Sequence, residues 1–417
     1  MSQPTNEPGV DRPPATADVA PVAAEAEVVR QTRLGGLKIP TDALRAYTML
    51  FALVVIWIAF QWATEGLFLG PRNFSNLMRQ AAVTGVLATG MLMVIVAGQI
   101  DLSVGSVVGL AGGVAAITQG WLGWGLAPSL AAGVAVGLLI GAAQGALVAY
   151  LNIPAFIVTL GGLLAWRGAI LGLSKGETIP IVLPGFKAIG QDYVGPSVGW
   201  ALAAVGVAAV AWAAYRRAGA RRRYGLEAQG RAATVLRVVL PAGTIVAFVY
   251  WMNSYELAPG RFAGIPVPVF ILLAVALTGA FLTRNTTFGR YLYAIGGNPD
   301  AARLSGISLR KHILAVFCLM GALAGVASII YTARVGSGAP DAGVLLELDA
   351  IAACVIGGTS LMGGRGTVFG ALLGALIMAS LDNGMSLENV QPYTQQIVKG
   401  AILVAAVGLD MAGRRRG

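Results

Sequence analysis

Charge is scarce in this sequence. Charged residues make up 12% of the chain, about half of the roughly 25% that is usual in a soluble globular domain. Apolar residues make up 56%, and the mean hydropathy is +0.74. This balance excludes an ordinary soluble domain and predicts a chain that lies largely within a membrane.

Motifs that would indicate an enzyme are missing. No G-x-x-x-x-G-K-[ST] motif occurs, and no glycine precedes a lysine anywhere in the chain, which excludes ATP binding through a P-loop. The single histidine, His312, stands beside Lys311 at the start of an apolar segment. No metal-ligand cluster and no pairing of a nucleophile with a base is visible in the sequence. We therefore expect neither an enzyme nor a cofactor bound by this chain.

Cysteine is also rare. Cys318 and Cys354 each stand inside an apolar run, and they are interpreted as small buried residues rather than as a disulfide or metal framework. The formal net charge is +10, but the basic residues form short runs between apolar segments, without the stacking aromatics of a nucleic-acid site. We therefore expect membrane lipid, and not nucleic acid, around the chain.

Long apolar segments are what the sequence has in abundance. About twelve of them recur between residues 44 and 413, each near the ~20 residues needed to cross the hydrocarbon core. The chain also has 57 glycines, which favours closely packed membrane helices. The predicted fold is an all-α polytopic membrane protein with segments at 46–64, 77–99, 102–120, 126–150, 155–174, 198–215, 237–254, 264–284, 312–332, 344–360, 365–384 and 394–412. Those at 102–120 and 344–360 are short and glycine-rich, and are the candidates for broken or re-entrant helices.

The distribution of basic residues orients these segments. Arginine and lysine gather before the first segment, in the loops at 216–237 and 284–311, and in the C-terminal tail at 414–417. Such regions face the cytoplasm, and twelve crossings place all four there, with both termini inside. Residues 1–43 are polar and rich in proline and alanine, and are expected to form a disordered cytoplasmic tail.

The loop at 284–311 contains the signature of a short helix at about 298–306. Asn298 suits the N-cap, Pro299 the first turn, Asp300 the positive end of the helix dipole, and Gly306 the left-handed residue that ends a helix. A helix of two turns is unstable alone and must dock. Two interpretations are open: it packs on this chain's own helix ends, or it docks a cytoplasmic partner.

Acidic residues near the apolar segments are a second candidate feature. Asp101 either caps the segment that follows it, through the amide of Ser103 or Val104, or lines a polar pathway, and the two roles are compatible. The other candidates for a polar lining in the C-terminal part are Asp349, Asp382 and Asn383.

At these segments the chain resembles the permease subunits of bacterial ABC importers for monosaccharides, of the ribose, xylose and galactoside type. The resemblance spans roughly residues 46–413. It is carried by Ile100–Ser106, Tyr293–Ile307, Leu348–Ser360 and Ala379–Ser386, with shorter matches at Phe156–Leu160 and Ile397–Ile402. Within the family, the run around Asp382 and the extra basic loop and segments at 216–254 favour the D-xylose type.

The resemblance implies a mechanism and partners. The chain would be a permease subunit of the bacterial inner membrane that passes a monosaccharide, D-xylose in our prediction, to the cytoplasm by alternating access. A periplasmic binding protein would deliver the sugar, a second copy of the chain would complete the pathway, and a separate cytoplasmic ABC ATPase would bind ATP and Mg. The short helix matches the place where such permeases dock the ATPase. The expected coupling residues are Asn298, Pro299, Asp300, Ala302, Arg303, Leu304 and Gly306.

Polar side chains that can hydrogen-bond sugar hydroxyls are the expected lining of the path, which should hold the sugar only loosely. They are Gln99, Asp101, Ser103, Asn152, Thr159, Asp349, Asp382 and Asn383. The alternative is a stand-alone secondary sugar transporter, which would need buried carboxylates for a proton or sodium relay and would ignore ATP.

Overall fold

The structure, a computed structural model, describes residues 31–34, 37–223 and 231–415. The chain divides into two units, Met1–Tyr47 and Thr48–Gly417. In the first unit, β1 (Gln31–Leu34) pairs antiparallel with β2 (Leu37–Pro40). Most of the tail predicted at 1–43 lies outside the described residues, as does the loop centre at 224–230 and the end of the tail at 416–417.

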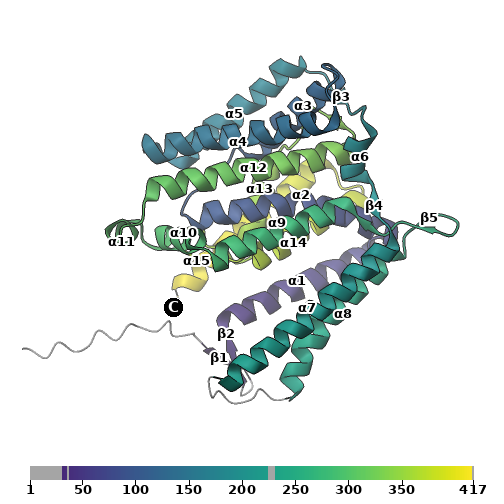
Figure 1. The fold of residues 1–417 in the computed structure, drawn as a ribbon, viewed down its shortest axis with the longest axis vertical. Coiled ribbons are helices and arrows are strands. Elements are labelled where there is room, and N and C mark those ends of the chain that lie inside the picture. Colours follow the sequence, from purple (N-terminus) through teal and green to yellow (C-terminus); the bar gives the residue numbers. More distant parts are fainter. Residues whose placement is uncertain (1–30, 35–36, 224–230, 416–417) are drawn as a thin grey trace, which may run out of the picture. The chain divides into compact units, whose positions relative to one another are not determined.

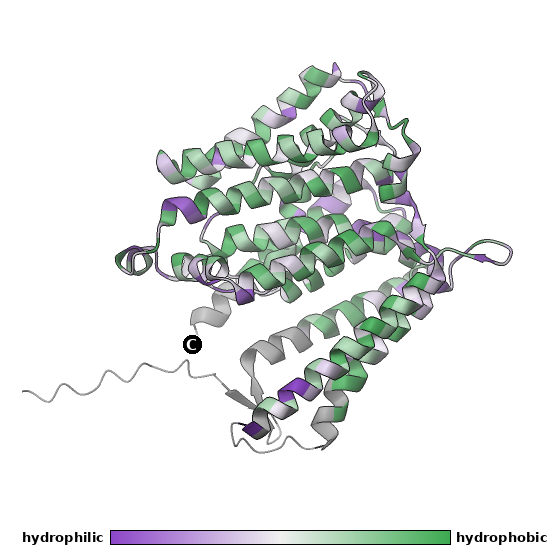
Figure 2. Cartoon of the chain, in the orientation of Figure 1, coloured by the Kyte–Doolittle hydropathy of each residue, from purple (hydrophilic) through white to green (hydrophobic). Residues whose placement is uncertain are grey.

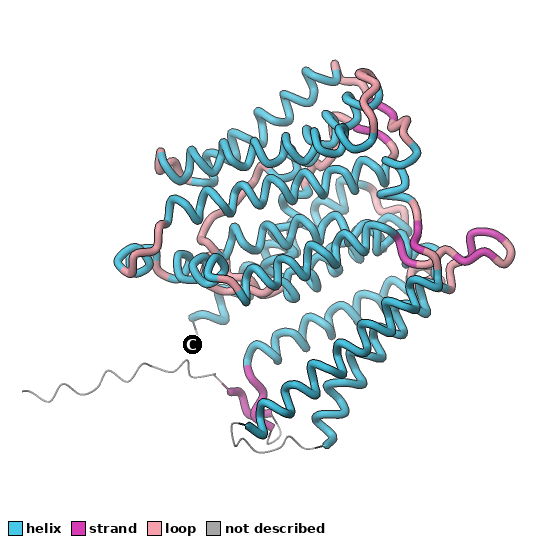
Figure 3. The backbone as a smooth tube through the Cα atoms, in the orientation of Figure 1, coloured by secondary structure: helices cyan, strands magenta, loops and turns pink. Residues whose placement is uncertain are grey.

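Helices dominate the described residues (Figure 3). Each of the twelve predicted apolar segments coincides with one helix. These are α1 (Thr41–Ala63), α2 (Pro71–Val96), α3 (Val104–Gly120), α4 (Leu126–Tyr150), α5 (Ala155–Ser174), α7 (Pro196–Arg223), α8 (Arg231–Asn253), α9 (Val267–Asn285), α12 (Leu309–Val335), α13 (Leu346–Ile356), α14 (Val368–Leu387) and α15 (Pro392–Arg415). Both flanks of the basic loop predicted at 216–237 are therefore helical.

Short elements connect these helices. Three further helices are α6 (Pro184–Gln191), α10 (Thr287–Gly297) and α11 (Pro299–Leu304). The remaining strands form antiparallel pairs: β3 (Ile179–Pro180) with β8 (Ser337–Gly338), β4 (Tyr193–Val194) with β7 (Ile265–Pro266), and β5 (Glu256–Ala258) with β6 (Arg261–Phe262). The sequence predicted α11 but neither α6 nor α10.

Seven helices within the described residues are long and apolar enough to cross a membrane, namely α2, α4, α5, α7, α9, α12 and α14. Their apolar residues run along the helix lengths, whereas hydrophilic residues gather towards the ends and in the connections (Figure 2). The chain is therefore a multi-pass membrane protein. The count of twelve crossings and the cytoplasmic position of both termini stay predictions.

Two helices form the centre of the second unit. α2 is almost entirely buried and packs against α9, α12, α13 and α14, while α12 packs against α2, α3 and α4 (Figure 1). The largest hydrophobic core cluster joins side chains of α2 with those of α12 and α13, including Leu92, Met320 and Ile351. The segments that carry the candidate functional residues are positioned against this pair.

Glycine sets the distance between α4 and α12. A side chain on Gly137 would meet the carbonyl oxygen of Gly321 and the backbone of Gly325, and one on Gly141 would meet the carbonyl oxygen of Phe317. Lipid is as apolar as a leucine side chain, so membrane helices gain little from hydrophobic burial and depend on such close backbone contact.

Replacement of one of these glycines tests the contact. Gly141→Leu is expected to lower the thermal stability of the detergent-solubilised protein, because overpacking costs about 1–3 kcal/mol or more. Gly168→Leu on α5, where no atom lies within 4 Å of the new Cβ, is the matched control and should leave stability unchanged. The measurement is the loss of the monodisperse chromatographic peak after heating, and equal curves for the two variants would contradict the packing described.

Candidate functional site

α11 is built as the sequence predicts. The side-chain oxygen of Asn298 accepts a hydrogen bond from the amide of Ala301 at 3.0 Å, and Pro299 is the first helical residue. Gly306, just after the helix, has φ of +82°. The Asn298 side chain thus gives one free amide of the first turn a hydrogen-bond partner, and Gly306 lets the chain turn after the helix. A helix of this length is too short to be stable alone.

One side of α11 is anchored and the other is open. Ala302 is buried, and the helix packs against α10 and α12. On the exposed side, Arg303 and Asp300 form an ion pair of 3.1 Å, and the Leu304 side chain is 86% exposed. The two interpretations from the sequence are thus compatible, since one face packs on this chain and the other is available to a partner.

α13 is a half-length helix. Its 11 residues extend roughly 16 Å at 1.5 Å per residue, about half of the ~30 Å hydrocarbon core. The segment that leads into it, 339–345, is irregular. Arg167 on α5 donates hydrogen bonds to the carbonyl oxygens of Pro340 and Ala342, at 2.8 and 2.7 Å. Irregular backbone within a membrane requires partners of this kind.

Glycines in α3 allow this irregular segment to approach. The carbonyl oxygen of Gly343 and the carboxylate of Glu347 lie where a side chain on Gly105 would be, and the carbonyl oxygen of Ala342 lies 2.6 Å from the Cβ position of Gly109. The buried Glu347 therefore places its carboxylate against the first turn of α3, where helix amides have no partner within the helix. The start of α13 is fixed between α3 and α5.

A partly buried charge cluster, Asp349–Lys399–Asp382, joins α13, α15 and α14. The Lys399 ammonium lies 3.0 Å from Asp349 Oδ2 and 2.8 Å from Asp382 Oδ1. The first contact is an aligned hydrogen bond, whereas the second is an ion pair only, because Asp382 Oδ1 has no aligned donor. Buried charges need such partners, so Lys399 ties the half-helix to two neighbouring helices.

Asp101 and Ser103 form a second buried polar cluster, just before α3. Asp101 accepts hydrogen bonds from the Ser103 amide at 2.8 Å and from the Ser103 hydroxyl at 2.7 Å. The predicted bond to the Ser103 amide is present, but Asp101 is not the N-cap of the helix, because α3 begins at Val104 and its N-cap is Ser103. The same hydroxyl lies 3.1 Å from the side-chain oxygen of Gln144 on α4. The Thr159 hydroxyl lies 3.4 Å from the carbonyl oxygen of Ile100 in this region.

The remaining predicted path residues lie apart from these clusters or have other partners. Asn383 exchanges two side-chain hydrogen bonds with Asn73 of α2, at 2.7 and 3.1 Å. Asn152 is an exposed turn residue with φ of +56° after α4, and Gln99 is half-buried between α2 and α3. The structure therefore brings Asp101 and Ser103 together and links Asp349 with Asp382. Their role in a path stays a prediction.

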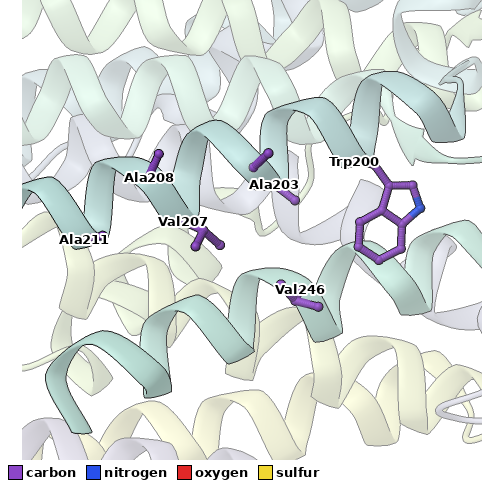
Figure 4. A pocket seen from close by; sticks show the side chains of 7 residues that line it. Trp200, Ala203, Val207, Ala208, Ala211 and Val246 are labelled. Atoms are coloured by element: carbon purple, nitrogen blue, oxygen red, sulfur yellow. The ribbon is translucent and has the colours of Figure 1, made fainter. Parts of the chain in front are cut away.

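A cavity of about 450 Å³ lies between α7 and α8 (Figure 4), and no residue of either polar cluster lines it. Its lining residues are Trp200, Ala203, Ala204, Val207, Ala208, Ala211 and Val246. Apart from the Trp200 indole, these side chains offer no hydrogen-bonding group. Because sugar recognition needs polar partners, this cavity is not suited to hold the substrate.

Four polar residues within apolar segments were missed by the sequence reasoning: Gln144, Arg167, Glu347 and Lys399. Each is a costly residue at membrane depth, and ionisable residues there are rare and usually paired. That signal was available for Arg167 and Lys399, since each is an isolated cation in an apolar run. Their partners, at residues 340, 342, 349 and 382, could not be identified from sequence separation.

The chain is similar to known sugar permeases of bacteria. Residues 73–407 match the protein family described as branched-chain amino acid transport system / permease component. The chain is 47% identical to the xylose transport system permease protein XylH of Escherichia coli strain K12 over 373 residues, which cover 89% of this chain and 93% of the relative. The chain is 46% identical to XylH of Haemophilus influenzae over 380 residues, which cover 91% of this chain and 99% of the relative.

Ribose permeases match less closely. The ribose import permease protein RbsC of Escherichia coli strain K12 is 35% identical over 361 residues, which cover 87% of this chain and 92% of the relative. No solved structure matches the chain.

Removal of the cation tests the charge cluster. Lys399→Met leaves two carboxylates without their partner, and because Lys399 and Asp382 are partly exposed, we expect a cost below the roughly 3–5 kcal/mol that is typical of a fully buried pair. We expect a clear loss of thermal stability in detergent, and recovery in the triple variant Lys399→Met, Asp349→Asn, Asp382→Asn. Lys187→Met at an exposed position of α6 is the control. Unchanged stability of Lys399→Met would contradict the proposed contribution of the cluster.

Proposed function

Because the chain belongs to the protein family described as branched-chain amino acid transport system / permease component, we propose that it is the permease subunit of an ATP-driven importer for D-xylose. The observation that carries the choice of sugar is the identity of 47% with a xylose permease, against 35% with a ribose permease, over similar lengths. The chain is a transport subunit of the inner membrane and not an enzyme.

An importer of this kind needs partners. A cytoplasmic ATPase supplies ATP hydrolysis, and a periplasmic binding protein delivers the sugar. The absence of a P-loop from the whole sequence agrees with ATP and Mg being bound by that separate ATPase. A second copy of this chain completes the pathway in our proposal.

The open face of α11 is the proposed contact with the ATPase. Movement of this helix tilts the attached helices and exposes the path alternately to the two sides of the membrane. The start of α13, between α3 and α5, is the proposed region of sugar passage, because discontinuous helices near the midplane are where transporters commonly place their substrate. Glu347 of α13 places its carboxylate against Gly105 of α3 in this region, and the Asp101–Ser103 pair lies just before the same helix.

The test is uptake of labelled D-xylose into vesicles that contain this chain, its ATPase and its binding protein. We expect uptake only with all three components and ATP. Arg303→Ala removes one side of the exposed ion pair on α11 and should reduce uptake severalfold, whereas Arg261→Ala in the exposed β5–β6 hairpin should not.

Two results would be decisive against the proposal. Uptake by this chain alone, without ATP, would identify a secondary transporter. Uptake of ribose but not xylose by the complete complex would support the ATP-driven importer and contradict D-xylose as its substrate.

A further inference from the structure

The loop between α13 and α14, residues 357–367, is held against α10. The amide of Gly364 donates a hydrogen bond to the carbonyl oxygen of Val96 at the end of α2, at 2.9 Å. A Cβ on Gly363 would lie 2.7 Å from the carbonyl oxygen of Gly296, and one on Gly364 would lie 2.9 Å from the Cα of Gly297. The backbones of loop and helix are therefore in direct contact.

The same loop is also closed on itself. The amide of Ser360 donates to the carbonyl oxygen of Arg365 at 3.0 Å, and the amide of Met362 donates to the Ser360 hydroxyl at 3.2 Å. From α10, the Tyr293 hydroxyl donates to the carbonyl oxygen of Gly366 at 2.8 Å. With Gly363 and Gly364 at φ of +85° and +71°, these bonds define one conformation. The loop and α10 are therefore joined by backbone contacts and by the Tyr293 hydrogen bond.

The 357–367 loop and α11 each present a large apolar side chain to the outside. Met362 is 70% exposed at the tip of the loop, and Leu304 is 86% exposed on α11, which directly follows α10. Hydrocarbon does not cover Leu304, because the exposed charges of Asp300 and Arg303 lie on the same short helix. Exposed apolar side chains rimmed by polar ones are typical of a protein interaction site.

We propose that Met362 and Leu304 belong to one docking surface for the cytoplasmic ATPase, and that the 357–367 loop passes the movement of α11 to the membrane helices. This inference rests on the proposed function. The partner is the ATPase because Gly363 and Gly364, next to Met362, contact Gly296 and Gly297 just before α11, where the ATPase is proposed to bind.

The loop connects this surface to the candidate path. It begins at the end of α13 and leads into α14, and its Gly364 amide holds the end of α2. A displacement of α10 and α11 is therefore applied at once to α2, α13 and α14. The half-helix that carries Glu347 and Asp349 is reached through backbone contacts and the Tyr293 hydrogen bond.

The first test uses the complete three-component complex. Met362→Asp is expected to weaken binding of the ATPase about tenfold, measured by titration of the ATPase on vesicles, since burial of a charge in an apolar contact is costly. Met362→Leu should bind like the unchanged chain. Leu257→Asp in the exposed β5–β6 hairpin is the control and should bind normally.

The second test separates docking from transmission. Gly363→Ala introduces a Cβ against Gly296 at a left-handed backbone position, so we expect normal ATPase binding but fewer xylose molecules transported per ATP hydrolysed. If the chain without substitutions neither binds the ATPase nor transports xylose, the proposed function itself is contradicted. A working complex in which Met362→Asp binds normally would overturn the docking inference, and normal transport per ATP with Gly363→Ala would overturn the transmission.

Discussion

Backbone contact through glycine is the constraint on which this structure depends. Helices in lipid gain no hydrophobic free energy by pairing, so dispersion contacts and hydrogen bonds must hold them together. The α4–α12 contact, the approach of 339–345 to α3 and the seat of the 357–367 loop on α10 all occur where a Cβ would meet backbone atoms. Contacts between backbones leave no side chain that can rotate away, so they transmit displacement directly.

Two charged side chains, Arg167 and Lys399, also hold the half-helix α13 in place. Arg167 holds the segment before α13, and Lys399 holds α13 itself through Asp349. Both cations lie in apolar segments, where their cost is met by partners rather than by water. At its C-terminal end, α13 leads into the 357–367 loop, whose glycines contact the backbone of α10. α13 is thus held by hydrogen-bonded cations at its start and by backbone contact at its end.

Local chemistry was predictable from the sequence, and distant partners were not. The twelve apolar segments coincide with helices because length and hydropathy are properties of one segment. The Asn298 cap and the turn at Gly306 were predictable for the same reason, since each involves neighbours only. Asn383 was predicted as a path residue, yet its amide pairs with Asn73, 310 positions away, and no sequence pattern indicates that partner.

We infer that α10, α11, the 357–367 loop and α13 move together when the ATPase binds ATP. Spin labels at Arg290 of α10 and Leu348 of α13, both exposed, can follow this movement by double electron–electron resonance in a complex with one labelled copy. We expect the same Arg290–Leu348 distance with and without ATP, while the distance from Arg290 to Val205 on α7 changes. A change in the Arg290–Leu348 distance on ATP binding would contradict it.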